Sequence, residues 1–141
     1  MPRVVKQEKI MKFFVSSNWS EKPLVADLQS WLQSKGHEIT LDWTTFPDTL
    51  EGTPQETYLQ NNAVLDIAGV RDCDILIALL TKDYVYRGTY CEMGAALALG
   101  KDVYLVGKYA DACIFSYHPL VTKLEDMWAL MRKVEGLHDK A

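Results

Sequence analysis

The sequence predicts an α/β fold in three layers, with a parallel sheet of four to five strands between helices. Two observations indicate this fold. Short apolar runs alternate along the chain with segments of helical periodicity, which is typical of βαβ units and a parallel sheet. The segment 74–80 (DILIALL) is continuously apolar, as expected for a strand that is covered on both faces.

The first strand is predicted at 12–16 (KFFVS), where a short apolar run ends in small polar residues. A helix follows, with Ser20 as its N-cap and Pro23 in the first turn, where a missing N–H has no cost. Gly36 is a typical helix stop. The apolar residues at helical spacing are Leu24, Leu28, Trp31 and Leu32. Residues 1–10 are interpreted as a flexible leader, and 11–141 as a single domain.

The second strand is predicted at 37–43, and 44–55 is an irregular segment, a loop long enough to cover a site. A helix is expected over 56–71. Its predicted apolar side consists of Leu59, Val64, Ile67 and Val70.

The third strand leads into a polar, tyrosine-rich loop at 81–88, an alanine-rich helix over 89–99 and a fourth strand at 103–106. A fifth strand is expected at 113–116, and a terminal helix over 120–134. The residues of this last helix expected to face inward are Leu124, Trp128 and Met131.

These elements predict a flavodoxin-like or Rossmann-like sheet with the strand order 2-1-3-4-5. In such sheets ligands bind at the carboxyl ends of the strands, where the strand order reverses. That point lies between the first and third strands. We therefore expect the loops at 16–20 and 81–88, and the helix that starts at Thr89, to border one crevice.

The segment 88–94 (GTYCEMG) is the densest candidate for chemistry. Glu92 would lie one turn into a helix, where free N–H groups favour an ionised carboxylate that is ready to attack. Thr89 and Glu92 also match a capping box, in which both side chains only satisfy the helix end. The pattern alone favours the capping box.

Composition narrows the classes of function. The net charge is −4 and no Lys/Arg-rich stripe exists, which argues against nucleic-acid polymers as partners. The three cysteines have no paired spacing and are expected to be reduced, buried and inert in a cytoplasmic protein. No apolar run approaches the length of a membrane span, so no membrane partner is expected. The histidines lack metal-ligand spacing, so no metal is expected, and no cofactor is expected either.

Several of these segments, in this order and spacing, resemble the nucleoside 2-deoxyribosyltransferase family, whose superfamily includes 2'-deoxynucleoside 5'-monophosphate N-hydrolases. The matching segments are FFVSSNWS, Asp66 and Asp74 with seven residues between them, the apolar third strand, and GTYCEMG followed by AALALGKDVYLV. The resemblance spans roughly residues 12–107.

The resemblance implies that Glu92 attacks the anomeric carbon of a 2'-deoxynucleoside and that Asp66 holds the sugar and orients Glu92. A second nucleobase would then take the deoxyribosyl group, as in nucleotide salvage. The expected partners are thus small nucleosides, nucleotides and nucleobases, in a homo-oligomer of two or more chains. The candidate substrate-binding residues are Ser16, Ser17, Trp19, Tyr84, Tyr86, Arg87, Gly88 and Thr89.

Alternatives stay open at this level. Tyr86 stands where many transferases of the family have an aspartate and several N-hydrolases a phosphate-binding serine, so neither branch matches fully. Arg87 beside Gly88 is suited to a 5'-phosphate, which favours an N-hydrolase that uses water. The opening FVSSNWSEK also resembles TIR-like domains, some of which hydrolyse NAD. A non-catalytic nucleotide-binding module is the last alternative.

Overall fold

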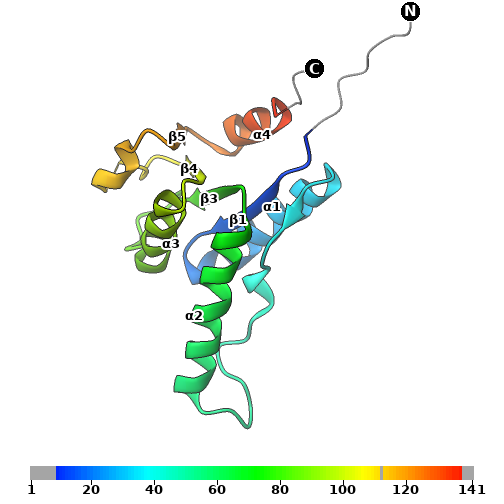
Figure 1. Ribbon diagram of the computed structural model, residues 1–141, viewed down its shortest axis with the longest axis vertical. Coiled ribbons are helices and arrows are strands. Elements are labelled where there is room, and N and C mark those ends of the chain that lie inside the picture. Colours follow the sequence, from blue (N-terminus) through cyan, green and yellow to red (C-terminus); the bar gives the residue numbers. More distant parts are fainter. Residues whose placement is uncertain (1–8, 112, 138–141) are drawn as a thin grey trace, which may run out of the picture.

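The computed structural model describes residues 9–111 and 113–137. Five parallel strands form one sheet in the order β2-β1-β3-β4-β5, which confirms the predicted fold class and strand order (Figure 1). The strands are β1 (Lys12–Ser16), β2 (Glu38–Ile39), β3 (Ile75–Leu79), β4 (Asp102–Val106) and β5 (Val121–Leu124). The helices are α1 (Lys22–Ser34), α2 (Gln55–Asp72), α3 (Arg87–Ala98) and α4 (Met127–Glu135), with short 3-10 turns η1 (Trp19–Glu21), η2 (Trp43–Thr45) and η3 (Ile114–Tyr117). Most of the predicted leader, residues 1–8, lies outside the described residues.

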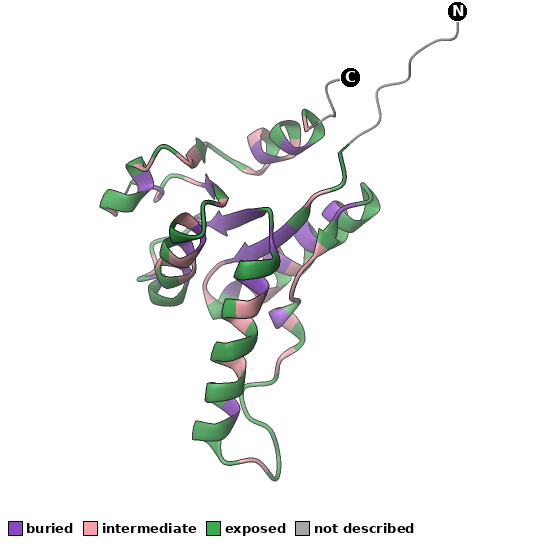
Figure 2. Cartoon of the chain, in the orientation of Figure 1, coloured by how far each residue is buried: buried purple, intermediate pink, exposed green. Residues whose placement is uncertain are grey.

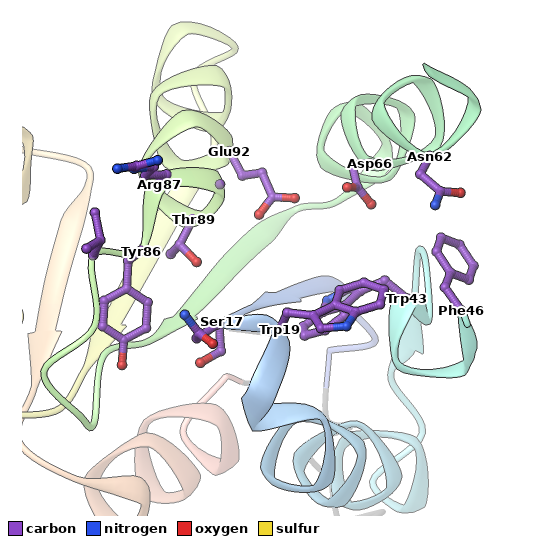
Figure 3. Close-up of a pocket in the computed structure, with 13 residues that line it drawn as sticks. Ser17, Trp19, Trp43, Phe46, Asn62, Asp66, Tyr86, Arg87, Thr89 and Glu92 are labelled. Atoms are coloured by element: carbon purple, nitrogen blue, oxygen red, sulfur yellow. The ribbon is translucent and has the colours of Figure 1, made fainter. Parts of the chain in front are cut away.

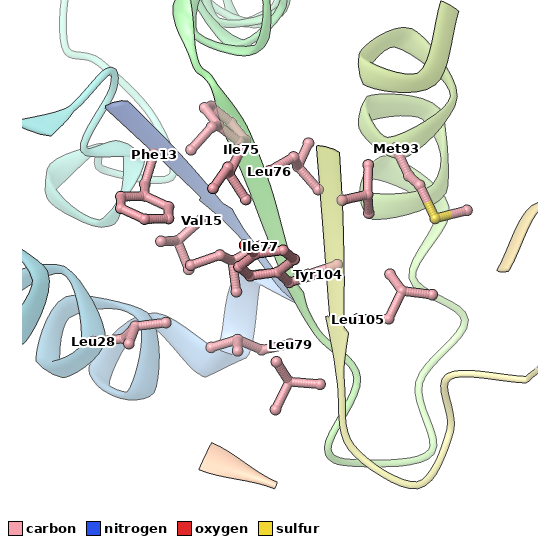
Figure 4. Close-up of a cluster of buried hydrophobic side chains, with 14 of the residues drawn as sticks. Phe13, Val15, Leu28, Ile75, Leu76, Ile77, Leu79, Met93, Tyr104 and Leu105 are labelled. Atoms are coloured by element: carbon pink, nitrogen blue, oxygen red, sulfur yellow. The ribbon is translucent and has the colours of Figure 1, made fainter. Parts of the chain in front are cut away.

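Helices cover both faces of the sheet. Parallel crossovers are right-handed, and the chain moves from β1 to β2 in one direction but from β2 through β3 to β4 in the other. Helix α1 therefore packs on one face, while α2 and α3 pack side by side on the opposite face (Figure 1). Figure 4 shows Leu28 of α1 and Met93 of α3 on opposite sides of the strands.

The core is centred on β3, whose five residues are all buried between the two helical layers. Full burial of each such aliphatic side chain contributes about 1.5–3 kcal/mol. Helix α2 approaches β1 closely at Gly69, where a Cβ atom would lie 2.9 Å from the Phe14 ring and 3.0 Å from Leu41. The absence of a side chain at Gly69 thus sets how near α2 comes to the sheet.

The second strand and the helix after it differ from the prediction. Strand β2 has two residues, because the chain turns into η2 at Trp43 and the Trp43 indole donates to the Val15 carbonyl at 2.7 Å. The predicted inward side of α2 is wrong except at Val70, since Leu59, Val64 and Ile67 are 54%, 66% and 42% exposed. The N-terminal half of α2 extends beyond the sheet (Figure 2), where Leu59 is exposed but Tyr58 is buried and donates to the Pro47 carbonyl at 2.6 Å.

The C-terminal elements also shift along the chain. The predicted fifth strand at 113–116 is wrong, since that segment forms η3, and β5 lies at Val121–Leu124 instead. The last helix begins at Met127, after Asp126, whose side chain accepts a hydrogen bond from the Ala129 N–H at 2.8 Å. Its buried residues are Leu130 and Val134, whereas Trp128 is 67% exposed.

The predictions for the start of α1 and for two of the cysteines need correction as well. Asn18, not Ser20, supplies the capping oxygen. Its side-chain oxygen accepts a hydrogen bond from the Ser20 N–H at 3.0 Å and so caps η1, which precedes α1. Cys91 is exposed and Cys113 is half-buried, so that of the three cysteines Cys73 is the one buried as expected. Within residues 9–111 and 113–137 no helix is both long and apolar enough to cross a bilayer.

Candidate functional site

A cavity of about 480 Å³ opens at the carboxyl ends of β1 and β3, the point where the strand order reverses (Figure 3). Its lining comes from the segment after β1, from η2, from α2 and from the first turns of α3. The lining residues are Ser17, Asn18, Trp19, Trp43, Phe46, Asn62, Asp66, Val85, Tyr86, Arg87, Gly88, Thr89 and Glu92. The fold thus brings the predicted loops together at the predicted edge.

Glu92 reaches this cavity from inside α3. The helix begins at Arg87, two residues before the predicted start, and its N-cap Tyr86 has a left-handed backbone with φ 53° and ψ 40°. Among the described residues no side chain caps this helix end, and the Thr89 hydroxyl instead bonds to the Ser16 hydroxyl at 2.9 Å. The capping-box interpretation of Thr89 and Glu92 is therefore wrong.

The Glu92 carboxyl is held in a poorly solvated position. Burial raises its pKa to about 7, a hydrogen bond from Ser16 at 2.6 Å acts to lower it, and the nearby Asp66 acts to raise it. A carboxyl with this pKa keeps a proton on about half of the molecules at neutral pH. Burial, and not the helix end, has the largest effect on this pKa, because Glu92 lies beyond the free N–H groups of the first turn.

Asp66 lines the same cavity from α2, and partial burial raises the pKa of its carboxyl as well. Figure 3 shows the side chains of Asp66 and Glu92 pointing toward one another from their two helices. Asn62 lies one turn before Asp66 on α2 and borders the cavity too. Sequence reasoning missed Asn62, although its spacing of four residues from Asp66 places it on the same helix face.

Aromatic rings form the wall opposite the carboxylates. The Trp19 and Trp43 rings stack with centroids 5.7 Å apart and planes at 23°. Both indole N–H groups are already bonded, Trp19 to Asp48 at 2.7 Å and Trp43 to the Val15 carbonyl at 2.7 Å. The two tryptophans therefore line the cavity with apolar ring surface, with the Lys22 ammonium 3.7 Å from the centroid of the Trp19 ring, and Phe46 adds a third ring.

The other predicted binding residues divide into two groups. Six of them line the cavity: Ser17, Trp19, Tyr86, Arg87, Gly88 and Thr89. Two do not. Ser16 lies buried behind Glu92, and the Tyr84 hydroxyl donates to Glu21 at 3.1 Å, outside the cavity. Glu21 also pairs with Lys82 at 2.9 Å, so Tyr84 and Lys82 fasten the loop after β3 to the start of α1.

The structure also adds lining residues that the pattern did not single out: Asn18, Trp43, Phe46, Asn62 and Val85. Trp43 and Phe46 follow the second strand, so their place at the carboxyl edge of the sheet was a usable signal for a site. The charged groups of the lining are the two carboxyls and Arg87. Among the described residues no group of three His, Cys, Asp or Glu side chains is arranged to hold a metal ion.

This arrangement suits attack on a carbon that becomes positively charged. A carboxylate can stabilise an oxocarbenium-like transition state and then bond to it, and a partly buried site strengthens that interaction. Stacked aromatic faces suit a flat heterocycle as the departing group. The cavity volume of about 480 Å³ is within the range of pockets for small ligands.

Comparisons with known proteins identify structures with a similar fold and the family of the chain. The CMP N-glycosidase of Clostridium botulinum is similar in structure, with a TM-score of 0.61 and 22% identity over 88% of this chain and 98% of that one. A 2-deoxyribosyltransferase from Bacillus psychrosaccharolyticus is similar with a TM-score of 0.63 and 20% identity, over 89% of this chain and 90% of that one. No curated protein sequence matches significantly. The profile of the nucleoside 2-deoxyribosyltransferase family matches residues 14–133, and the chain therefore belongs to the nucleoside 2-deoxyribosyltransferase family.

Proposed function

We propose that this protein cleaves the N-glycosidic bond of 2'-deoxynucleosides and transfers the deoxyribosyl group to another nucleobase. The observation that carries the proposal is the pair of partly buried carboxyls, Glu92 and Asp66, which face one cavity opposite a wall of stacked rings. Membership in the family and the two structural neighbours support an enzyme of this kind.

In the proposed reaction the ionised Glu92 carboxylate attacks the anomeric carbon. The bond from that carbon to the base nitrogen breaks, and the base leaves with the electron pair and takes up a proton from solvent. A glycosyl ester on Glu92 results. An acceptor base then attacks the same carbon, releases the Glu92 carboxylate and loses its proton.

The remaining lining residues have complementary roles in this proposal. Asp66 accepts hydrogen bonds from the sugar and keeps it against Glu92. Trp19, Trp43 and Phe46 hold the faces of the base, and the amide of Asn62 is placed to bind its edge.

A second candidate, hydrolysis of a 2'-deoxynucleoside 5'-monophosphate, is favoured by Arg87. Arg87 and Gly88 line the cavity at the start of α3, where backbone N–H groups and a guanidinium suit a phosphate. Figure 3 shows Arg87 turned away from the two carboxylates, which suits a phosphate at the rim rather than the reacting carbon. In this reaction water replaces the acceptor base.

We further propose a homo-oligomer of two or more chains. Exposed apolar side chains on α2, namely Leu59, Val64, Leu65 and Ile67, support this, since a second copy can cover them. Light scattering of the purified protein tests the proposal, and a monomer mass contradicts it. A cytoplasmic location stays part of the proposal and is tested by fractionation of the source cells.

Detection of free base by chromatography tests the reaction. The protein is incubated with the four deoxynucleosides and their 5'-monophosphates, with and without an added base, beside Glu92→Gln. Glu135→Gln is the matched control, since Glu135 is an exposed glutamate on α4. New nucleosides that form only with an added base support the transferase, and base released from monophosphates in water supports the hydrolase.

We expect Glu92→Gln to lower turnover by orders of magnitude and Glu135→Gln to leave it unchanged. Absence of turnover across the whole panel contradicts both candidates. NAD cleavage, tested in the same assay, or a binding role without catalysis then becomes the better explanation.

A further inference from the structure

Ser16 is the last residue of β1 and is almost fully buried, with 1% of its surface exposed. In the sheet it lies beside Ala78 of β3, at the edge where the cavity opens. Its hydroxyl contacts two side chains of α3: the Glu92 carboxyl at 2.6 Å and the Thr89 hydroxyl at 2.9 Å. Ser16 therefore joins the sheet to the residue that we propose as the nucleophile.

The chemistry of these groups gives the chain of hydrogen bonds a direction. An ionised carboxylate only accepts hydrogen bonds, so the single Ser16 proton points to Glu92. The bond between the two hydroxyls must then be donated by Thr89. Thr89 is 2% exposed, so this short chain from Thr89 through Ser16 to Glu92 is shielded from water.

Neither hydroxyl has a separate structural task in the described part of the chain. The Thr89 side chain does not cap α3, and the recorded bonds of the Ser16 hydroxyl are those to Thr89 and Glu92. A threonine inside a helix often bonds back to a carbonyl of the preceding turn, but here it bonds across to β1. The pair is thus directed at the Glu92 carboxyl.

We propose that Ser16 and Thr89 are positioning residues that hold one oxygen of the Glu92 carboxylate and leave the other free to face the substrate. The inference rests on the proposed function and corrects the expected role of Ser16, which is behind the nucleophile instead of in contact with substrate. Within the described chain, Ser16 is the hydrogen-bond donor recorded for Glu92.

The surroundings of Glu92 explain why such a chain is needed. Burial and Asp66 on α2 both raise the pKa of Glu92, and Ser16 on β1 opposes them. The other titratable side chains that line the cavity are Tyr86, also buried, and Arg87, whose side chain is turned away in Figure 3. Loss of the Ser16 hydroxyl is therefore expected to raise the pKa of Glu92 further, so that a smaller fraction of the carboxyl is ionised and able to attack at neutral pH.

The test measures the titration of the Glu92 carboxyl directly, by carbon NMR of glutamate-labelled protein, with Glu92→Gln to assign the signal. We expect Ser16→Ala to raise the pKa of Glu92 from about 7 by on the order of one pH unit. Thr89→Val is expected to raise it by less, and Thr89→Ser to restore it, because serine keeps the hydroxyl. Ser116→Ala is the matched control, since Ser116 is equally buried and its hydroxyl has no hydrogen-bond partner within the described residues.

The pH dependence of base release is the second readout. In Ser16→Ala the acid limb of kcat/KM is expected to move to higher pH, so that kcat/KM falls about tenfold at pH 6 and approaches wild type above pH 9. The same fall at every pH, with an unchanged Glu92 titration, overturns the inference and indicates that Ser16 contacts substrate. The NMR titration needs no turnover: if it shifts while no base is released, the positioning role stands and the proposed reaction fails.

Discussion

Replacement of Glu92 by glutamine is expected to stabilise the fold at neutral and alkaline pH, although it removes the proposed nucleophile. The pKa of Glu92 is raised in the folded protein from 4.5 to about 7, mainly by burial. Such a difference between the unfolded and folded chain corresponds to about 3 kcal/mol. Because Glu92 borders a cavity that opens to water, we take this figure as an upper bound and expect about 2 kcal/mol.

The effect has a defined pH window. Below pH 4.5 the carboxyl holds its proton in both states, so the wild type and the Glu92→Gln variant differ little in stability. Between pH 4.5 and about 7 the unfolded chain releases the proton while the folded chain keeps it, so the free energy of unfolding of the wild type falls. Above pH 7 the folded protein bears a poorly solvated charge, and the full difference is present. Glutamine carries no charge and can still accept the hydrogen bond from Ser16.

Urea unfolding at pH 4, 6 and 8 measures this difference, with Glu135→Gln as the control for the same change at an exposed site. The expected result is a stability gain in Glu92→Gln that is near zero at pH 4 and largest at pH 8. A variant that is less stable than the wild type at pH 8, or a difference that is the same at every pH, refutes the reasoning. A loss of about 1 kcal/mol at all three pH values would instead be the behaviour of a lost helix cap.

Three further predictions follow from the same geometry. The kcat/KM of the wild type for a deoxynucleoside should rise with pH through a midpoint near 7, because Glu92 must lose its proton to attack, and a pH–rate profile checks this. Asp66→Asn removes the neighbouring charge, so it should lower the pKa of Glu92 and move that midpoint to more acidic pH. It also removes a proposed sugar ligand, so kcat/KM at the optimum should fall, and the pH–rate profile separates the two effects. Gly69→Ala should reduce the free energy of unfolding by about 1–3 kcal/mol, since its Cβ would meet the Phe14 ring at 2.9 Å, and urea unfolding beside Gly94→Ala, where a Cβ meets nothing within 4 Å, tests it.

The order of the sheet and the place of the site were predictable from local patterns. Apolar runs such as 74–80 are long enough to mark buried strands, and alternation with helices permits few topologies. Strand order then decides which loops meet, so the loops at 16–20 and 81–88 were expected together and line one cavity in the structure. Glu92 and Asp66 were singled out by the family resemblance, and their catalytic roles remain predictions.

Other features depend on distant contacts that local pattern does not contain. The apolar residues of α2 do not mark its buried side: Tyr58, Gly69 and Val70 are buried, whereas Leu59 and Val64 are exposed. The second strand was predicted to run to Trp43, but β2 ends at Ile39 and Trp43 begins η2. There its indole N–H donates to the carbonyl of Val15, which lies 28 residues earlier in the chain.

Sequence alone thus determined the fold class, because hydrophobic periodicity marks the alternating strands and helices. The strand order and the edge that holds the site were predicted from the common order of flavodoxin-like sheets, and the structure confirms that order. Tertiary structure decided the burial, the hydrogen bond and the pKa of the Glu92 carboxyl. Thr89-x-x-Glu92 indicates a helix cap in isolation, and the folded chain turns the same two residues toward Ser16, which lies 76 residues from Glu92 along the chain. Burial and the partners brought by other elements set the pKa of a carboxyl, and both exist only after the chain has folded.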